Sequence, residues 1–201
     1  MGDPGGIGPE VIVKSLAERA RRSRARFVIH GSGIALHRAA ERCDVEPYWW
    51  RVEAGSALGE SAAAHDVVLM DDDQPEWRDS ASPPAFDHRP TRLGGELSFR
   101  WVERAIADGK RAADDPARAG AVVTGPISKQ AWALAGRRKY PGHTELLADR
   151  FGAKRTAMMF EGPAVRVVLA TVHIPLMEIR NTLTIGRVFD AIDLGAEGCQ
   201  R

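Results

Sequence analysis

Several features that mark particular classes of protein are missing from this sequence. No apolar run approaches the roughly 20 residues that cross a bilayer, and the N-terminus lacks the basic flank and apolar core of a signal peptide. The only two cysteines, Cys43 and Cys199, lie far apart and without the spacing of a metal site. We therefore expect a cytoplasmic protein without disulfides and without a membrane partner.

A strong excess of one charge is also missing. The chain of 201 residues carries 28 Lys and Arg against 27 Asp and Glu, which gives a net charge of +1. The basic segment Arg19–Arg26 is local and is typical of the solvated end of a helix. No nucleic-acid partner is therefore expected. The hydrophobic content of 44% fits an ordinary globular protein.

What is present is an alternation of short apolar runs with amphipathic segments, which predicts an α/β fold with a mostly parallel sheet and flanking helices. Strands are expected at about residues 27–30, 48–52, 67–70, 121–124, 156–160 and 165–171. Helices are expected at about residues 10–22, 33–43, 95–113, 128–134, 143–151 and 185–196. A loop opens the chain where a strand should precede it, and the last helix should lead to a further strand, so we expect a fold truncated at both ends.

The segment Ala121–Leu176 organises the chemistry. The runs Ala121–Thr124 and Val165–Thr171 read as buried parallel strands, each followed by a loop punctuated with Gly or Pro. Ligands of open α/β sheets bind at the carboxyl ends of the strands. We therefore expect the loop at Thr124–Pro126, the loop at His173 and the segment Tyr140–Glu145 to converge on one crevice.

Residues at the start of the helix expected at 143–151 could hold an anion. His143 and Thr144 offer donors beside a helix N-terminus, which suits a phosphate ester, and Lys129 could add a positive charge. The alternative is structural: Thr144 would cap the helix, Glu145 would be an ordinary acid of the first turn, and Lys129 would be an exposed lysine.

Two features allow a metal ion. His173 follows an expected strand, and a neutral imidazole is a common metal ligand, but a catalytic zinc needs about three protein ligands. A hydrogen-bonded structural histidine is the alternative. The acidic run Asp71–Asp73 could bind a cation or simply be solvated within an exposed loop at Asp71–Arg92.

The opening segment Gly2–Gly8 is a glycine-rich loop before a helix, and Pro9 suits a first helical turn. Such a loop is a candidate anion or cofactor site. It matches neither the dinucleotide fingerprint nor the phosphate loop that ends in Gly-Lys-Ser/Thr. A phosphoryl-transfer enzyme built on this loop is one alternative function.

Four segments in order resemble one family, the 4-hydroxythreonine-4-phosphate dehydrogenase or PdxA family of pyridoxal-phosphate biosynthesis. They are the opening Gly2–Glu10, the Thr-Gly-Pro loop Thr124–Lys129, the Tyr-Pro-Gly-His-Thr-Glu motif Tyr140–Glu145, and Thr171–Leu176 with its His-Ile-Pro-Leu sequence. Each motif by itself is a weak signal, whereas the ordered set is specific.

The resemblance implies a homodimer with a fold like that of isocitrate and isopropylmalate dehydrogenases. It implies NAD- or NADP-dependent oxidation of a secondary alcohol, followed by loss of carbon dioxide from the keto acid. By motif match, His143 and Thr144 would bind the phosphorylated hydroxy-acid substrate. His173 would be one of three histidine ligands of a divalent metal, Zn, Mg or Co, which would favour the alkoxide and polarise the ketone.

The sequence departs from the family pattern in several places. Gly5 stands where the family has alanine, and Val172 stands where it has threonine. The motifs that carry the other two metal histidines are not in the chain. Residues 1–201 therefore resemble the N-terminal part, about three-fifths, of a two-lobed dehydrogenase whose second lobe is incomplete, and we expect weak metal binding and little turnover.

Two other functions stay open on the sequence. A family relative could oxidise a phosphorylated four-carbon sugar acid, such as 4-phosphoerythronate or threonate, or a dihydrodiol dicarboxylate. Alternatively, the chain could be a non-catalytic, truncated remnant that folds or dimerises without turnover.

Overall fold

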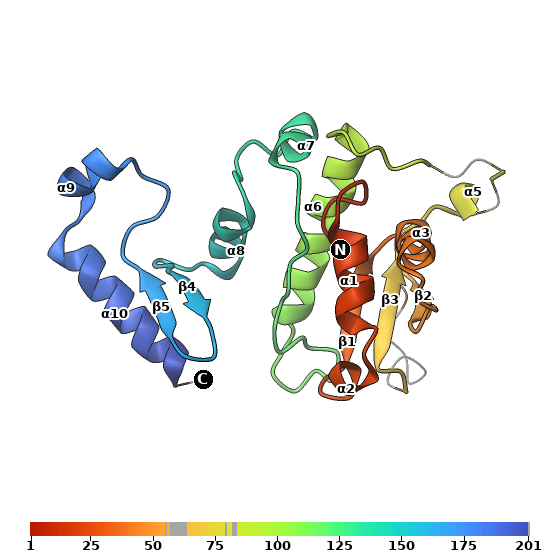
Figure 1. Ribbon diagram of the computed structural model, residues 1–201, viewed down its shortest axis with the longest axis horizontal. Helices are drawn as coiled ribbons and strands as arrows, with labels where there is room; N and C mark the ends of the chain where they lie inside the picture. The colour runs from red at the N-terminus through yellow and green to blue at the C-terminus, as the bar shows by residue number, and fades with distance from the viewer. Residues whose placement is uncertain (55, 57–63, 79, 82–83, 201) are drawn as a thin grey trace. The chain divides into compact units, whose positions relative to one another are not determined.

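The chain forms two compact units, Met1–His143 and Thr144–Arg201, whose elements are labelled in Figure 1. The computed structural model describes residues 1–54, 56, 64–78, 80–81 and 84–200. Within these residues, no helix has the length and apolar character that crossing a membrane requires.

The first unit contains a sheet and the helices that cover it. Its strands are β1 (Phe27–Gly31), β2 (Trp50–Glu53) and β3 (Val67–Asp71). Its helices are α1 (Gly8–Leu16), α2 (Arg19–Arg22), α3 (Gly33–Cys43), α5 (Pro75–Arg78), α6 (Arg92–Gly109) and α7 (Lys129–Leu134). Helix α8 (His143–Phe151) begins where the second unit starts.

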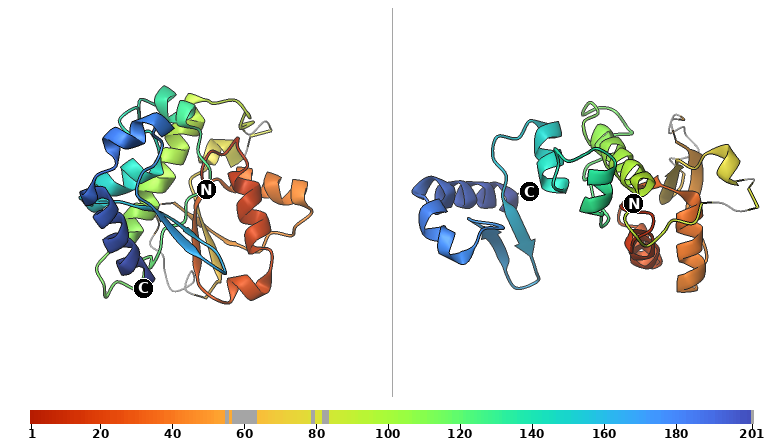
Figure 2. Two further views of the ribbon diagram at one scale, coloured as in Figure 1. Left: turned by 60° about the vertical axis from the view of Figure 1, so that its left-hand side comes forward. Right: turned by 90° about the horizontal axis from the view of Figure 1, so that it is seen from above.

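The three strands of the first unit are all parallel, in the order β1-β3-β2. Side chains alternate between the two faces of the sheet. Val67 and Leu69 therefore pack in one cluster with residues of α1 and α3, whereas Val68 and Met70 pack with Val52. The expectation of an α/β fold with a parallel sheet and flanking helices is confirmed for this unit, and Figure 2 shows its helices from two further directions.

The first helix is interrupted where one continuous helix was expected at residues 10–22. Helix α1 ends at Leu16, and α2 begins at Arg19. The Arg22 side chain donates to the carbonyl oxygens of Leu16 and Ala17, both at 2.7 Å. It thereby satisfies acceptors that a helix end leaves open, so the chain can turn there before β1.

The acidic run Asp71–Asp73 is neither solvated nor a metal site. Asp71 is 1% and Asp73 4% exposed. Their carboxylates accept hydrogen bonds from the Gly33 and Ile34 N–H groups at the start of α3, both at 2.8 Å. They therefore stabilise the positive end of this helix, and the expectation of an exposed loop is wrong at these residues.

Arginines neutralise the same acidic run. Asp71 is bonded to Arg51 and Arg78, whereas Asp72 is bonded to Arg100 and Arg104 of α6 at 2.9 and 2.8 Å. The described residues contain no group of three His, Cys, Asp or Glu that could hold a metal ion. The run therefore fastens α3 and α6 to the end of β3.

The expected buried strand Ala121–Thr124 does not form. These residues have no regular secondary structure, and Val123 is 90% exposed. A strand needs a neighbour that accepts and donates its backbone hydrogen bonds, and the sheet described in this unit contains only β1, β2 and β3. The apolar run by itself was therefore not enough to predict a strand, and the expectation of a buried strand is wrong here.

The second unit contains an antiparallel hairpin where a buried parallel strand was expected at residues 165–171. Strand β4 (Met158–Glu161) pairs with β5 (Arg166–Leu169), with Met158 opposite Leu169. Only four residues separate the strands, which suffices for a hairpin but not for a parallel crossover of a dozen or more residues. The expectation of a parallel strand is therefore wrong here, and the residues of β5 are exposed or half-buried.

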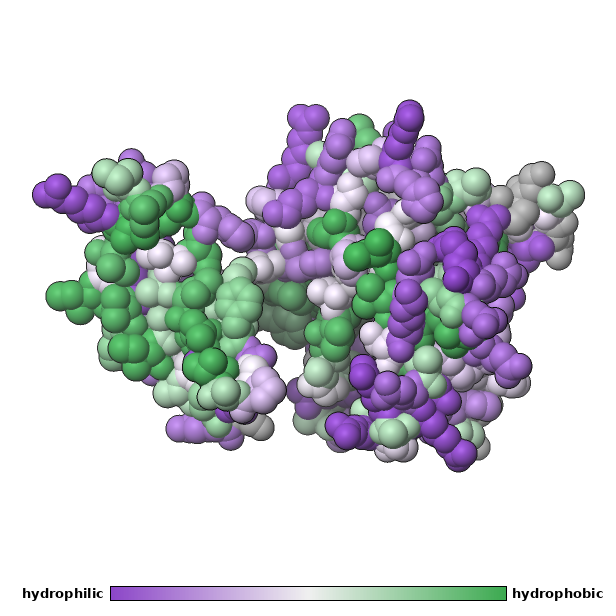
Figure 3. All heavy atoms as spheres, viewed as in Figure 1, coloured by the Kyte–Doolittle hydropathy of each residue, from purple (hydrophilic) through white to green (hydrophobic). Residues whose placement is uncertain are grey.

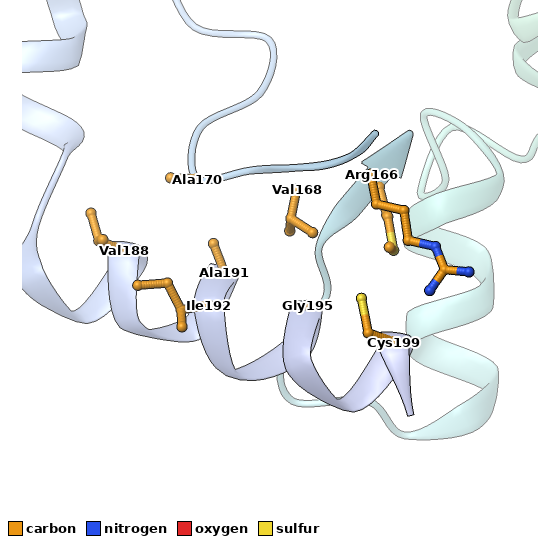
Figure 4. A pocket seen from close by; sticks show the side chains of 9 residues that line it. Arg166, Val168, Ala170, Val188, Ala191, Ile192, Gly195 and Cys199 are labelled. Carbon is orange, nitrogen blue, oxygen red and sulfur yellow. The ribbon is translucent and has the colours of Figure 1, made fainter. Parts of the chain in front are cut away.

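Helices follow the hairpin: η1 (Leu176–Glu178), α9 (Ile179–Thr182) and α10 (Ile185–Cys199). A hollow of about 330 Å³ lies between α10 and the hairpin, lined by Val168, Ile192 and Cys199 among others (Figure 4). No residue of α10 is buried, and apolar side chains gather on the surface of this unit in Figure 3.

One buried hydrogen-bonded pair of side chains connects β1 to α6. His30 Nε2 lies 2.8 Å from Asp108 Oδ2, and both residues are less than 10% exposed. Burial alone would raise the pKa of the Asp108 carboxyl, but hydrogen bonds from His30 and Arg111 outweigh that effect and hold the pKa below its ordinary value. The pair therefore contributes stability while Asp108 is ionised.

We predict that Asp108→Asn lowers the free energy of unfolding at pH 7 by about 1–3 kcal/mol, because a buried charge-assisted hydrogen bond is lost. The folded-state pKa of Asp108 is depressed, so this stability is complete above the unfolded pKa of 3.8 and is lost as the pH falls through the folded-state pKa. Urea titrations at several pH values would measure the difference, which should shrink in acid. Asp114→Asn, the same change at an exposed residue, should have little effect. A difference between Asp108→Asn and wild type that does not depend on pH would contradict the ionic role.

Candidate functional site

The candidate site rests on a close contact between α6 and α7. Gly95 of α6 packs so tightly against the Ala131 carbonyl group that a Cβ at this position would overlap it. Ala131 is fully buried. Only glycine permits this approach of two backbones, so Gly95 fixes where α7 lies.

A tryptophan on α7 extends the contact. Trp132 is 0% exposed, and its indole Nε1 donates to Ser98 Oγ of α6 at 3.0 Å. The Ser98 hydroxyl in turn donates to the Gly95 carbonyl at 3.3 Å. Phe99 meets the Trp132 ring edge to face, with centroids 5.1 Å apart. Both polar groups of this buried contact are therefore hydrogen-bonded.

The same aromatic cluster holds the loop that leads into α8. Tyr140 is 8% exposed, and its ring lies 5.9 Å from that of Phe99. Its backbone N–H donates to the Arg137 carbonyl at 3.1 Å, and the Arg137 N–H donates to the Trp132 carbonyl at 2.8 Å. The Tyr140–Glu145 motif is thus anchored to α6 and α7 just before His143.

His143 is the first residue of α8, and its ring meets Trp132 nearly edge-on, at 5.6 Å and 78°. Its Nε2 atom is buried, and the described residues offer it no hydrogen-bond partner. Burial lowers the pKa of this imidazole below its ordinary value, and the charge of the Met1 amine lowers it too. Since burial lowers the pKa of the Met1 amine itself to about 5, burial of the ring is the main cause near neutral pH. His143 is therefore a neutral hydrogen-bonding group rather than a cation.

Thr144 follows His143 inside α8 and is exposed. Its position inside the helix does not support the alternative that it caps α8. Lys129 is the first residue of α7 and is exposed, and the cap of that helix is Ser128, whose Oγ accepts from the Ala131 N–H at 3.1 Å. The exposed Thr144 thus directly follows His143 in α8.

The glycine-rich opening loop has a structural use. Three of its N–H groups are already bonded within the protein: Asp3 to the Pro126 carbonyl at 2.9 Å, Gly6 to the Asp3 carbonyl at 3.0 Å, and Gly5 to Asp3 Oδ1 at 3.0 Å. Gly2 has a φ of +89°, and a Cβ there would overlap the Pro126 carbonyl. These donors are not free for a phosphate, so the phosphoryl-transfer alternative loses its main support.

His173 belongs to the second unit, after β5. It is exposed, and its φ of +55° places it in the left-handed region that non-glycine residues rarely adopt. No group of three metal-binding side chains occurs among the described residues, so none of them completes a ligand set around His173. Its expected role as a metal ligand stays a prediction.

Within the first unit, the backbone of Met1 and Gly2 lies against the loop at Gly125–Pro126. The convergence of this loop, the Tyr140–Glu145 segment and the His173 loop on one crevice stays a prediction. Sequence reasoning missed Ser98 and Trp132. A signal was available, because two aromatic residues, Trp132 and Tyr140, lie in the sequence between the Thr-Gly-Pro loop and His143.

Comparison with known proteins shows the family of this chain. The family model described as pyridoxal phosphate biosynthetic protein PdxA matches residues 25–201. The chain is 37% identical over 194 residues to a 4-hydroxythreonine-4-phosphate dehydrogenase of Geobacter metallireducens, covering 96% of this chain and 53% of the relative. It is 32% identical over 209 residues to a D-threonate 4-phosphate dehydrogenase of Cupriavidus necator, covering 100% of this chain and 56% of the relative. This chain belongs to the PdxA family.

The solved structures agree with the fold. A 4-hydroxythreonine-4-phosphate dehydrogenase from Burkholderia phymatum superposes with a TM-score of 0.74 at 26% identity, covering 97% of this chain and 55% of that one. The expected resemblance to isocitrate dehydrogenase-like α/β folds is therefore confirmed. The chain spans about half the length of the PdxA relatives it matches.

We predict that Gly95→Ala lowers the free energy of unfolding by about 1–3 kcal/mol, because the added methyl group must push α7 away from α6. Thermal and urea unfolding would measure this loss. Gly186→Ala is a matched control, since Gly186 also lies in the first turn of a helix but has only a distant neighbour. It should be neutral or slightly stabilising. Equal effects of the two changes would show that the contact at Gly95 is not tight.

Proposed function

We propose that this PdxA-family chain contributes to an NAD- or NADP-dependent dehydrogenase of a phosphorylated hydroxy acid, with 4-phosphohydroxy-L-threonine as the substrate. The observation that supports the substrate site is the buried Nε2 atom of His143, which has no partner in the described structure. A buried polar atom without a partner costs free energy, and an oxygen of a bound substrate would remove that cost.

The chemistry of the first turn of α8 suits such a substrate. A neutral His143 imidazole can donate a hydrogen bond to a hydroxyl or carboxylate oxygen without adding charge. The Thr144 hydroxyl lies next to it, and the N-terminus of α8 favours negative charge. A bound nicotinamide would supply the hydride chemistry of the oxidation. The residues of this chain bind and orient the substrate.

The metal does not fit the described residues by themselves. His173 is a single exposed ligand, so we assign no reaction step to a metal in this chain. We propose that the chain is the N-terminal part of a two-lobed dehydrogenase with an incomplete second lobe, which its coverage of about half of its relatives supports. A site of three histidines including His173, a homodimer and a cytoplasmic location stay predictions.

A second candidate substrate is D-threonate 4-phosphate. The Cupriavidus necator relative is named as the dehydrogenase of this compound, and a relative from Bradyrhizobium diazoefficiens carries a similar name. The two substrates differ in that one has an amino group where the other has a hydroxyl. A neutral His143 can serve either, so the choice between them needs a direct comparison.

We predict that the purified chain binds one of these two compounds and that His143→Asn weakens binding at least about tenfold, because a desolvated hydrogen bond is lost. Calorimetric titration with each compound, with chelator and then with zinc or magnesium, would measure this. Thr144→Val should weaken binding in the same direction. His65→Asn, at a histidine that stacks on Trp50, is the control and should bind like wild type.

Absorbance of the reduced nicotinamide would be followed in the same samples. Reduction that requires one compound and is lost in His143→Asn would support the dehydrogenase and identify its substrate. Binding without reduction would support a substrate site in a chain that turns over little. If wild type and His143→Asn bind equally, or neither compound binds to the folded chain, the proposed substrate site is wrong, and the non-catalytic alternative gains support.

A further inference from the structure

A chain of contacts runs from the backbone of α6 to the imidazole of His143. It starts at the Gly95 carbonyl, passes through the Ser98 hydroxyl to the Trp132 indole, and ends at the edge of the His143 ring. Ser98 and Trp132 are both fully buried. A side chain that is fully buried and hydrogen-bonded has little freedom to rotate, so it can set the orientation of a ring packed against it.

We propose that Trp132, fixed by its hydrogen bond to Ser98, is a positioning residue that sets the orientation of the His143 imidazole and keeps its Nε2 atom shielded from water until a substrate oxygen binds there. The statement about substrate rests on the proposed function. The statement about orientation and dryness does not, because it concerns the protein without ligand.

Three observations support a positioning role rather than ordinary packing. The indole ring meets the imidazole edge-on, at 5.6 Å and 78°, which is a preferred aromatic arrangement. Phe99 holds the indole from a second direction, at 5.1 Å and 75°. The imidazole Nε2 is buried without being bonded to the described residues.

The consequence is a polar atom prepared for a ligand before the ligand arrives. Holding a hydrogen-bonding group in place in advance lowers the entropy that binding must overcome. The Trp132 indole also excludes water from the atom that the ligand will contact, and a hydrogen bond formed there without water is stronger. Trp132 thus acts on the substrate through His143 and not by touching it.

The chain contains a matched control for this idea. Trp101 of α6 is also fully buried, at 1% exposure, and its Nε1 also donates to a side-chain oxygen, Asp72 Oδ2 at 3.2 Å. Trp101→Phe and Trp132→Phe therefore remove the same atoms and one hydrogen bond each. Both should lower Tm by comparable amounts, but only Trp132→Phe removes a contact of His143.

The experiment is a pH titration of the His143 ring carbons and nitrogens by NMR in the full chain, with the signal assigned by its loss in His143→Asn. We expect the pKa of His143 to lie below its ordinary value in wild type and in Trp101→Phe. In Trp132→Phe the pKa should rise toward the ordinary value by at least about half a unit, because water reaches the ring. The Met1 amine, which also acts on His143, is the same in all variants.

Ser98→Ala gives a second test that leaves the indole in place. It removes the acceptor of the Trp132 N–H, so the pKa of His143 should shift in the same direction but less. An unchanged His143 titration in both Trp132→Phe and Ser98→Ala, or an equal shift in Trp101→Phe, would overturn the proposal.

Binding of 4-phosphohydroxy-threonine and threonate 4-phosphate to the same variants separates this proposal from the proposed function. We expect a rise in Kd of about tenfold in Trp132→Phe and none in Trp101→Phe. If the titration changes as expected but wild type binds neither compound, the positioning role stands and the proposed substrate class fails. If wild type binds and both Kd and titration are the same in Trp132→Phe, the substrate class stands and the positioning role fails.

Discussion

The contact between the backbones of α6 and α7 at Gly95 is the constraint on which the candidate site depends. It allows Ser98 of α6 to reach the indole of Trp132, and the indole in turn supports the His143 ring. A side chain at residue 95 would separate the two helices by the width of a methyl group. The hydrogen bond and the aromatic contacts would then be stretched together, because interiors are close-packed and do not deform smoothly.

Polar groups are arranged differently at the end of β3 and at His143, the two places in the first unit where the sequence offered candidate binding residues. At the end of β3, the start of α3 and several arginines bond the acidic residues. Among the described residues, Asp73 Oδ1 and Arg78 Nε are the buried side-chain atoms there without a hydrogen-bond partner. At the start of α8, the Nε2 atom of a neutral imidazole has no hydrogen-bond partner among the described residues. The first arrangement stabilises the fold, whereas the second has the open polar group that binding requires.

The family motifs also separate into two kinds. The opening Gly2–Glu10 and the Thr-Gly-Pro loop are joined by a backbone hydrogen bond from the Asp3 N–H to the Pro126 carbonyl. Their glycines are explained by close backbone approach. The Tyr140–Glu145 motif is different, because its tyrosine is anchored in the aromatic cluster, whereas Thr144 is exposed and the buried Nε2 atom of His143 has no partner among the described residues. Motif residues that look alike in sequence thus have structural or binding roles according to what surrounds them.

The sequence by itself determined the helices and strands with a regular apolar pattern, the parallel arrangement of β1, β2 and β3, and, through four ordered motifs, the family. These depend on local periodicity and on residue types at fixed spacing, which the chain carries wherever it folds. Tertiary structure alone decided that Ala121–Thr124 forms no strand, that β5 pairs antiparallel with β4, and that Asp71 and Asp73 are buried. It also decided that Trp132 and Ser98 support His143. Each of these outcomes depends on which distant group satisfies a backbone or side-chain polar atom, and that pairing is set by contacts between residues far apart in the sequence.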